Sequence, residues 1–357
     1  MNKSPLIHLS MRNEISSRTA WIIRACSFIA AILIGALIFL CLGHSPKEAY
    51  GIIISAALGK ASGLRQTAKY AIPLLGTALA LAPCFKMRYW NIGAEGQITA
   101  GAMAATFFAL NFKAMNQPSL LIIMAIAAAL LGGIWAAIPA FFKANWGTNE
   151  TLFTLMMNYI MIGIVKWLQG GPWEGKPGSQ IIPTFSDNAI LPKLCGVYCG
   201  WVVVLLLVFV IFFYMNYTKH GYEIAVIGNS INTARYVGMN VKKVIVRTAF
   251  MSGAICGVVG YMVASGAHNT LYSDVAAGNG FTAITVAWLS QLNPFAMVFI
   301  SLILGILEKG ASTLQTKLAI PASISDIIVG IFLFCMLAGE FFIRFKINFR
   351  KSSKEGK

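Results

Sequence analysis

Long apolar runs separated by short polar stretches dominate the chain. Most runs come close to the roughly 20 residues that cross a bilayer as a helix. Three of them are short for a span and are flanked by Gly, Asn or Pro, which is typical of broken or re-entrant transporter helices: 97–112, 280–292 and 294–307. The other runs are 20–42, 69–85, 119–142, 150–168, 198–217, 243–265 and 323–345. We therefore expect an all-α, polytopic membrane protein with about ten transmembrane or half-spanning helices.

The composition excludes a soluble catalytic domain. Of the 357 residues, 57% are hydrophobic and only 11% are charged, whereas soluble domains have about 45–50% apolar and about 25% charged residues. No stretch of roughly 100 residues, the size of a globular domain, has a normal charge density. Energy for any transport must therefore come from an ion gradient or from another chain.

The basic residues give the expected orientation. The formal net charge of +16 arises from Lys and Arg that lie between apolar runs, which is a topology signal rather than a nucleic-acid footprint. They gather before the first run, in the 218–242 connection and after the last run. We expect these three regions to be cytoplasmic and the 170–197 connection to be external.

This orientation divides the chain into a basic N-terminus at 1–19, a transmembrane domain at 20–345 and a basic tail at 346–357. Both termini are then cytoplasmic and the number of crossings is even. A further basic group, Lys47, Lys60, Arg65 and Lys69, falls on the predicted outer side and weakens the pattern. For that reason we expect 46–64 to include an interfacial helix.

Catalytic and metal motifs are absent from the sequence. Residues 170–177 resemble a phosphate-binding loop, but Pro177 stands where that motif needs Ser or Thr. The chain has no His-Glu-x-x-His, Gly-x-Ser-x-Gly or Cys-x-x-Cys pattern, and its four histidines are far apart. We expect no catalytic residue, no metal site and no cofactor in this chain.

Polar side chains interrupt the apolar pattern most conspicuously at 91–97. Here Asn91, Glu95 and Gln97 lie among two glycines at the start of a short apolar run. One interpretation is a helix terminus that lines a solute cavity, where the amides bond to freed backbone groups or to solute. The other is a cytoplasmic turn in which Glu95 pairs with the nearby Arg88.

Other polar residues favour ordinary structural roles. Asn149 and Glu150 open a span in which Asn158 lies two turns further on, and we expect Asn149 to cap this helix. Glu308 and Asp326 border the last connection between apolar runs. We expect both carboxylates to be interfacial charges.

The connection at 221–240 is unusual for a loop. Small residues alternate with apolar ones, which favours short helices with a close-packing face over a solvated linker. Such a surface would otherwise expose apolar positions to water. We therefore expect it to dock a cytoplasmic partner.

Several of these segments together resemble one family. Residues 91–97, 149–160, 221–238, 283–288 and 293–295 are similar to the permease subunits of bacterial ABC importers. The resemblance is to the branched-chain amino acid, ribose and nucleoside permease family, in its nucleoside and simple-sugar branch. It covers the chain from Ala20 to Phe345.

The resemblance implies a set of partners. In that family two homologous permeases pair, a separate ATPase subunit binds the ATP, and an extracytoplasmic lipoprotein delivers the small-molecule solute. It also implies an inner-membrane location in a bacterium. The ATPase-coupling segment would include Gly221, Tyr222, Glu223, Ala225, Gly228, Asn229, Ala234 and Gly238. The solute path would include Asn91, Glu95, Gln97, Asn158 and Trp288.

Alternatives remain open at the level of the sequence. A nucleoside or related ribosyl or sugar-like solute is the first expectation, and riboflavin or a monosaccharide is the second. A gradient-driven secondary transporter would instead need buried titratable groups. Glu95, Glu150 and Asp326 are its candidates.

Overall fold

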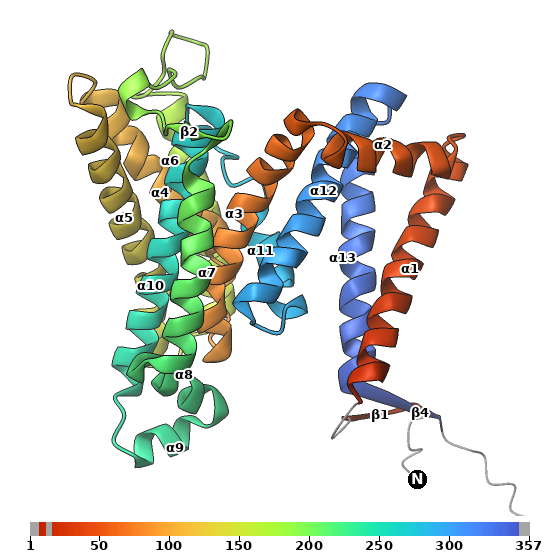
Figure 1. Cartoon of the computed structure of the whole chain (residues 1–357). Coiled ribbons are helices and arrows are strands. Elements are labelled where there is room, and N and C mark those ends of the chain that lie inside the picture. Colours follow the sequence, from red (N-terminus) through yellow and green to blue (C-terminus); the bar gives the residue numbers. More distant parts are fainter. Residues whose placement is uncertain (1–6, 12–15, 350–357) are drawn as a thin grey trace, which may run out of the picture. The chain divides into compact units, whose positions relative to one another are not determined.

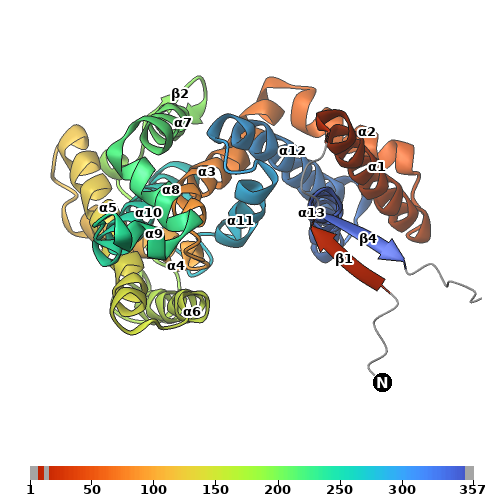
Figure 2. The same ribbon diagram turned by 90° about the horizontal axis from the view of Figure 1, so that it is seen from below.

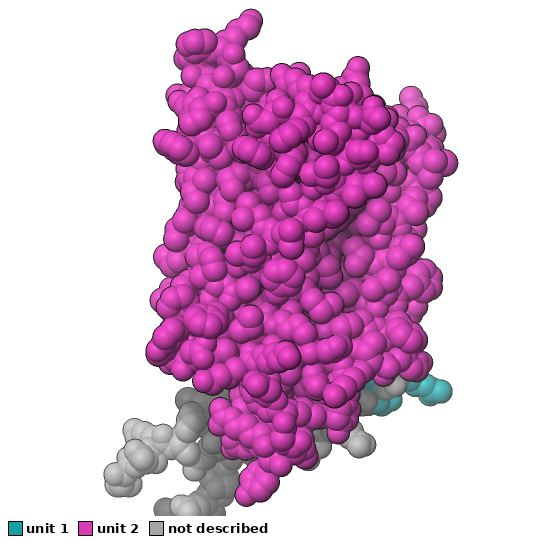
Figure 3. Space-filling model, turned by 90° about the vertical axis from the view of Figure 1, so that its left-hand side faces the viewer, with its two compact units in different colours: residues 1–57, 307–357 teal, residues 58–306 magenta. Residues whose placement is uncertain are grey.

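The computed structural model describes residues 7–11 and 16–349. In these ranges the chain forms thirteen α-helices and two short antiparallel strand pairs. They divide into two compact units: residues 1–57 with 307–357, and residues 58–306. Figure 3 shows one face of the larger unit. We call the two parts the smaller unit and the larger unit.

The larger unit is built around α10, which packs against α3, α4 and α5 (Figures 1 and 2). The connection between α6 and α7 lies at the opposite end of this unit from α8 and α9. Its helices are α3 (Ala61–Lys86), α4 (Ala94–Asn111), α5 (Gln117–Trp146), α6 (Glu150–Gln169), α7 (Gly200–Tyr217), α8 (Lys219–Asn229), α9 (Ile231–Tyr236), α10 (Val241–Met262), α11 (Asn279–Leu289) and the start of α12 (Pro294–Leu318). It also contains η1 (Asp187–Ala189), the π-helix η2 (Val263–His268) and the strand pair β2 (Lys193–Leu194) and β3 (Val197–Tyr198).

The smaller unit packs the two ends of the chain together. It contains α1 (Ser17–Cys41), α2 (Pro46–Leu58, up to residue 57), the end of α12 and α13 (Ala322–Arg344). Strand β1 (Ile7–Met11) pairs antiparallel with β4 (Phe345–Phe349), with Ile7 opposite Phe349. This pairing brings the first and last described segments to the same end of the unit, as an even number of crossings requires.

The expected number of membrane elements is confirmed. Eight helices of the described chain are long and apolar enough to cross a membrane. To these are added α4 with 18 residues and α11 with only 11 residues. The protein is therefore a polytopic, all-helical membrane protein, and the strand pairs are small additions that the apolar pattern did not predict.

One predicted half-span is wrong. The apolar run at 294–307 is only the first part of α12, which has 25 residues. Glu308 and Lys309 end the apolar run but are good helix formers, so the helix continues through them. The predicted helix within 46–64 exists as α2, although it ends at Leu58 and α3 begins at Ala61.

Glycines allow the central helices to approach closely. A Cβ atom on Gly257 of α10 would collide with the carbonyl oxygen of Ala128 in α5, and one on Gly260 would collide with that of Ile98 in α4. Gly253 faces Gly132 of α5 in the same way. Small residues at this spacing are the usual device for close packing of membrane helices.

Replacing Gly257 by leucine is expected to prevent correct folding of the larger unit. The new side chain would have to push apart two backbones, which should cost at least about 3 kcal/mol. Gly163→Leu is the matched control, because a Cβ on Gly163 meets no atom within 4 Å. The monodisperse fraction in size-exclusion chromatography should collapse for the first variant and stay at the wild-type level for the second. Equal fractions for both variants would contradict the packing argument.

Candidate functional site

A polar bend joins α3 to α4 deep inside the larger unit. Helix α3 ends at Lys86, and Arg88 adopts the left-handed conformation with φ of 60°. The side-chain amide of Asn91 then donates to the hydroxyl of Ser252 at 3.4 Å. Ser252 lies about 16 Å along α10 from Val241, given the helical rise of 1.5 Å per residue. The bend is therefore level with the middle of α10 rather than with its end.

The amides predicted at the bend bond to each other. Asn91 Oδ1 accepts from Gln97 Nε2 at 2.9 Å, and Asn91 Nδ2 donates to Gln97 Oε1 at 3.2 Å. Asn158 of α6 accepts from the backbone N–H of Gly96 at 2.8 Å and donates to the carbonyl of Ile92 at 2.9 Å. All three amide side chains are buried. In this conformation they stabilise the break between two helices and are not open to solute.

Glu95 links the two short helices of the larger unit. Its Oε1 accepts the backbone N–H of Gly278 and its Oε2 that of Gly280, both at 2.8 Å. The carboxylate thus caps the N-terminus of α11, where the helix dipole favours negative charge. Glu95 is only 4% exposed. Arg88 is exposed, and no ion pair of the described residues joins it to Glu95, so the predicted partnership is wrong.

Helix α11 is bounded by strained backbone at both ends. Ala277, which precedes it, has φ of 48°, and Gln291 and Leu292, which follow it, have φ of 52° and 60°. Side chains other than glycine rarely adopt this conformation, and it is concentrated at functional sites. Together with the π-helix η2 before it, this makes α11 a short helix between two irregular backbone segments, a pattern that is typical of the discontinuous helices of transporters.

An aromatic stack lies next to the bend. Trp288, near the end of α11, stacks on Trp90 with ring centroids 5.4 Å apart and on Phe85 at 5.8 Å. Phe85 is buried, whereas Trp90 is 44% exposed. The sequence indicated Trp288 but not Trp90, although Trp90 directly precedes the Asn91 motif. The stack therefore has a surface that is accessible to solute, whereas the buried amides have none.

The remaining predicted polar positions have structural partners or lie on the surface. Asn149 caps α6, because its side chain accepts the N–H of Leu152 at 3.2 Å; this prediction is confirmed. Glu150 forms an ion pair with Lys143 at 2.7 Å. Asp326 is exposed in the first turns of α13.

The predicted coupling segment folds as α8 and α9. Its close-packing face is directed toward the rest of the larger unit: a Cβ on Gly221 would collide with the backbone of Tyr214, and one on Gly228 with the carbonyl of Lys86. Ala234 is buried in the same core. These small residues therefore attach the helix pair to its own chain.

The opposite face of α8 and α9 is exposed. Tyr236 is 95% and Tyr222 64% exposed, and Ile231 and Val237 are also exposed. Of the other predicted coupling residues, Asn229 and Gly238 are exposed, whereas Glu223 and Ala225 are half-buried. The large exposed residues are thus the ones available to a partner.

An ion pair fixes α8 to α10. Arg247 Nη2 donates to Glu223 Oε2 at 2.8 Å, and His220 Nδ1 lies 3.7 Å from the same oxygen. The hydrogen bond from Arg247 lowers the pKa of Glu223 below its usual value. The carboxylate therefore stays ionised at neutral pH and holds the orientation of α8.

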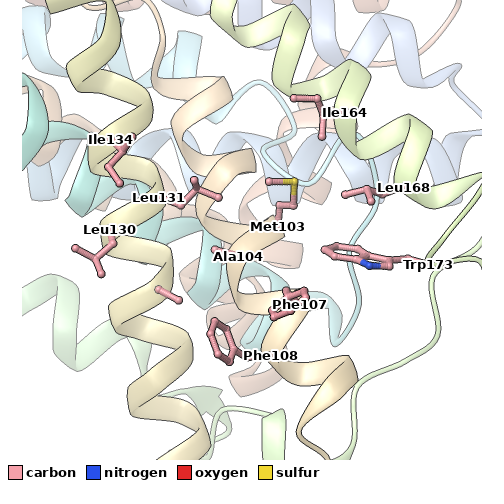
Figure 4. A pocket seen from close by; sticks show the side chains of 11 residues that line it. Met103, Ala104, Phe107, Phe108, Leu130, Leu131, Ile134, Ile164, Leu168 and Trp173 are labelled. Carbon is pink, nitrogen blue, oxygen red and sulfur yellow. The ribbon is translucent and has the colours of Figure 1, made fainter. Parts of the chain in front are cut away.

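A hollow in the larger unit does not suit a polar solute. It has a volume of about 530 Å³ and lies between α4, α5, α6 and Trp173. Figure 4 shows apolar side chains around it, among them Phe107, Phe108 and Leu131. None of the lining side chains offers more than an indole N–H for hydrogen bonding.

Comparison with known proteins agrees with this architecture. Residues 63–337 match the family described as branched-chain amino acid transport system / permease component. The chain is 28% identical to the glucose ABC transporter permease protein TsgB13 of Haloferax volcanii, over 96% of this chain and 93% of that protein.

Two Bacillus subtilis proteins are similar as well. The guanosine ABC transporter permease protein NupP is 28% identical, over 92% of this chain and 96% of its own length. NupQ, also a guanosine ABC transporter permease protein, is 25% identical over 67% of this chain and 78% of its own length. The chain belongs to the branched-chain amino acid transport system permease family, and it is a non-catalytic, multi-pass membrane subunit of an ABC importer.

Proposed function

We propose that this chain is one of two homologous permeases in a binding-protein-dependent importer of nucleosides or simple sugars. The proposal is supported by near full-length similarity both to a glucose permease and to a guanosine permease. The matches to NupP and NupQ of one organism support a pair of different permeases over two identical copies. The complex would lie in the cytoplasmic membrane, with a separate ATPase subunit and an extracytoplasmic binding lipoprotein.

The solute class is inferred from the stack of Trp90 on Trp288. A flat aromatic surface binds nucleobases by stacking, and the apolar face of a sugar ring fits it as well. Neither ring adds charge, which suits neutral solutes. In this proposal the buried network of Asn91, Gln97 and Asn158, together with Glu95, holds the path in place, and Trp288 contacts the solute.

Transport would proceed by alternating access. The exposed face of α8 and α9 would bind the ATPase on the cytoplasmic side, and the 170–197 connection would face the binding protein outside. ATP-driven closure of the ATPase pair would then favour one orientation of the solute path over the other. The connection between α6 and α7 lies at the opposite end of the larger unit from α8 and α9, which supports this division of roles.

Trp288→Ala is expected to reduce uptake strongly. Loss of one stacked aromatic partner costs about 1–3 kcal/mol, so uptake per assembled complex should fall about fivefold to a hundredfold. Trp288→Phe keeps a stacking ring and should retain most of the activity. Uptake is measured in proteoliposomes that contain both permeases, the ATPase and the binding protein. If Trp288→Ala transports as well as wild type, Trp288 has no place in the solute path.

Competition identifies the solute. Unlabelled guanosine, inosine, ribose, glucose and riboflavin are added in turn to the same proteoliposomes. Inhibition by nucleosides or sugars supports the proposal, whereas inhibition by riboflavin alone supports the alternative cargo. Membership in an ABC permease family argues against the gradient-driven alternative. Uptake should therefore persist when an uncoupler is added at constant ATP.

A further inference from the structure

The turn that ends α3 carries an arginine where glycine is usual. The N–H of Tyr89 donates to the carbonyl of Cys84 at 2.9 Å, and the N–H of Arg88 donates to the carbonyl of Phe85 at 3.0 Å. These two bonds form a Schellman motif, whose left-handed position is most often glycine. Here that position is Arg88, with φ of 60°. A Cβ atom strains the backbone in this conformation, which glycine adopts more easily.

The arginine side chain does not account for this strain. Arg88 is exposed, and no ion pair in the described part of the chain involves its guanidinium. A positive charge could be carried by a neighbouring exposed position without any strain. Residues other than glycine that are held in a left-handed conformation are concentrated at functional sites, where the surrounding structure keeps them in place. The backbone of this turn is therefore the feature that needs a role.

Helix α8 packs directly on this turn. A Cβ atom on Gly228 would collide with the carbonyl oxygen of Lys86 and would lie 3.4 Å from the Cα atom of Met87. Tyr89, which is 4% exposed, belongs to the same hydrophobic core as Ile224 of α8. Close-packed interiors transmit displacement rather than absorb it. A movement of α8 therefore acts directly on the end of α3.

Trp90 lies between two anchored residues. On one side, Tyr89 is held in the core that contains α8. On the other side, Asn91 is held by Gln97 of α4. The N–H of Asn91 also donates to the carbonyl of Tyr89 at 3.1 Å, which closes a three-residue turn around Trp90. The orientation of the Trp90 ring, and with it the stack on Trp288, therefore depends on where the α8 core lies relative to α4.

We propose that Arg88 is a positioning residue for Trp90: its left-handed backbone forms a stiff joint, through which a displacement of α8 turns the Trp90 ring relative to Trp288. A residue with a Cβ atom has fewer accessible conformations than glycine, so it transmits a displacement that a glycine joint would absorb. This inference rests on the proposed function, in which α8 and α9 bind the ATPase and the aromatic stack contacts the solute. Arg88 then connects these two sites.

Substitutions of Arg88 separate its backbone from its side chain. Arg88→Ala removes the charge but keeps the Cβ atom and the strain, whereas Arg88→Gly removes all three. Gln180→Gly is the matched control, because Gln180 has φ of 50° in the 170–197 connection and its backbone hydrogen bonds remain available to glycine. Both glycine variants should unfold at a temperature no lower than that of wild type, since glycine suits the left-handed conformation. A loss of transport in Arg88→Gly is then not a loss of fold.

The amount of solute imported per ATP hydrolysed is measured in proteoliposomes of the complete importer. Arg88→Gly should lower this ratio about two- to fivefold, which corresponds to the larger conformational freedom of glycine. Arg88→Ala and Gln180→Gly should keep the wild-type ratio. A purely structural role of Arg88 would reduce the amount of folded complex and leave the ratio unchanged.

Fluorine NMR observes Trp90 without any transport. The permease pair is labelled with 5-fluorotryptophan and placed in nanodiscs, and the Trp90 signal is assigned by its loss in Trp90→Phe. When unlabelled ATPase is added with ATP and vanadate, this signal should shift in wild type and in Arg88→Ala. In Arg88→Gly the shift should be lost, because the flexible joint no longer passes the displacement to the ring.

The outcomes separate the inference from the proposed function. A wild-type Trp90 signal that does not respond to ATP, or an Arg88→Gly variant with the wild-type ratio of solute to ATP, would overturn the inference. An equal loss in Arg88→Ala and Arg88→Gly would also overturn it, because the side chain would then be responsible. A wild-type complex that imports neither guanosine nor glucose contradicts the proposed function, while the fluorine signal still shows whether Trp90 follows α8.

Discussion

Replacing Glu95 by glutamine is expected to destabilise the larger unit and to reduce transport by the molecules that still fold. The carboxylate accepts two backbone N–H groups at the start of α11. A glutamine amide offers one oxygen and presents its own N–H₂ group to the other donor. One buried N–H then has no acceptor and the charge at the helix N-terminus is lost, which together should cost about 2–4 kcal/mol.

The effect should reach the solute path because α11 holds Trp288 near its other end. Thermal unfolding in detergent and uptake per assembled complex are measured for Glu95→Gln and for Glu48→Gln. Glu48 is also a carboxylate at the start of a helix, in the first turn of α2, but it is exposed. We expect a clear fall in unfolding temperature and uptake only for the buried position. If the two variants behave alike, Glu95 does not hold the two helices together.

That the chain is a polytopic membrane protein was predictable, because the thickness of the bilayer sets the length and the hydropathy of each spanning helix. The short α11 and the N-cap at Asn149 were also predictable, since glycines and capping residues act locally. Helix α12 was predicted too short because hydropathy and helical propensity give different ends. Glu308 ends the apolar run, yet it continues the helix.

Contacts between distant segments could not be predicted. Glu95 meets Gly278 and Gly280 across more than 180 residues of sequence. Arg88 is much nearer in the sequence and was the partner in one of the two interpretations, but its side chain is exposed. Trp90 acquires a role only because Trp288 is folded against it. The pairing of β1 with β4 joins the two ends of the chain and leaves no local signal either.

The small residues at 221–238 show what a pattern leaves undetermined. Their spacing correctly predicted helices with a close-packing face. It did not say which surface the face packs against, and Gly228 in fact contacts the carbonyl of Lys86 in the same chain. A bulky charged residue at Gly228 should therefore impair folding.

Tyr236→Ala is expected to weaken binding of the ATPase subunit without affecting the fold of the permease. Tyr236 is 95% exposed at the end of α9, and Val237 beside it is 62% exposed. An aromatic residue that becomes buried at the centre of an interface commonly contributes about 2 kcal/mol or more. Affinity for the ATPase should fall roughly thirtyfold, and ATP-dependent uptake should fall with it.

Two variants separate docking from packing. Tyr159→Ala removes an equally large residue that is 62% exposed on α6, away from α8 and α9, and should leave ATPase binding unchanged. Gly228→Val should lower the folded yield, because its side chain meets the backbone of Lys86. Binding is measured with the permease pair in nanodiscs and the purified ATPase. Wild-type affinity in Tyr236→Ala would mean that the ATPase binds elsewhere, because Tyr236 is the most exposed of the large apolar side chains of α8 and α9. A helix pair that couples hydrolysis to transport must contact its partner through its exposed face.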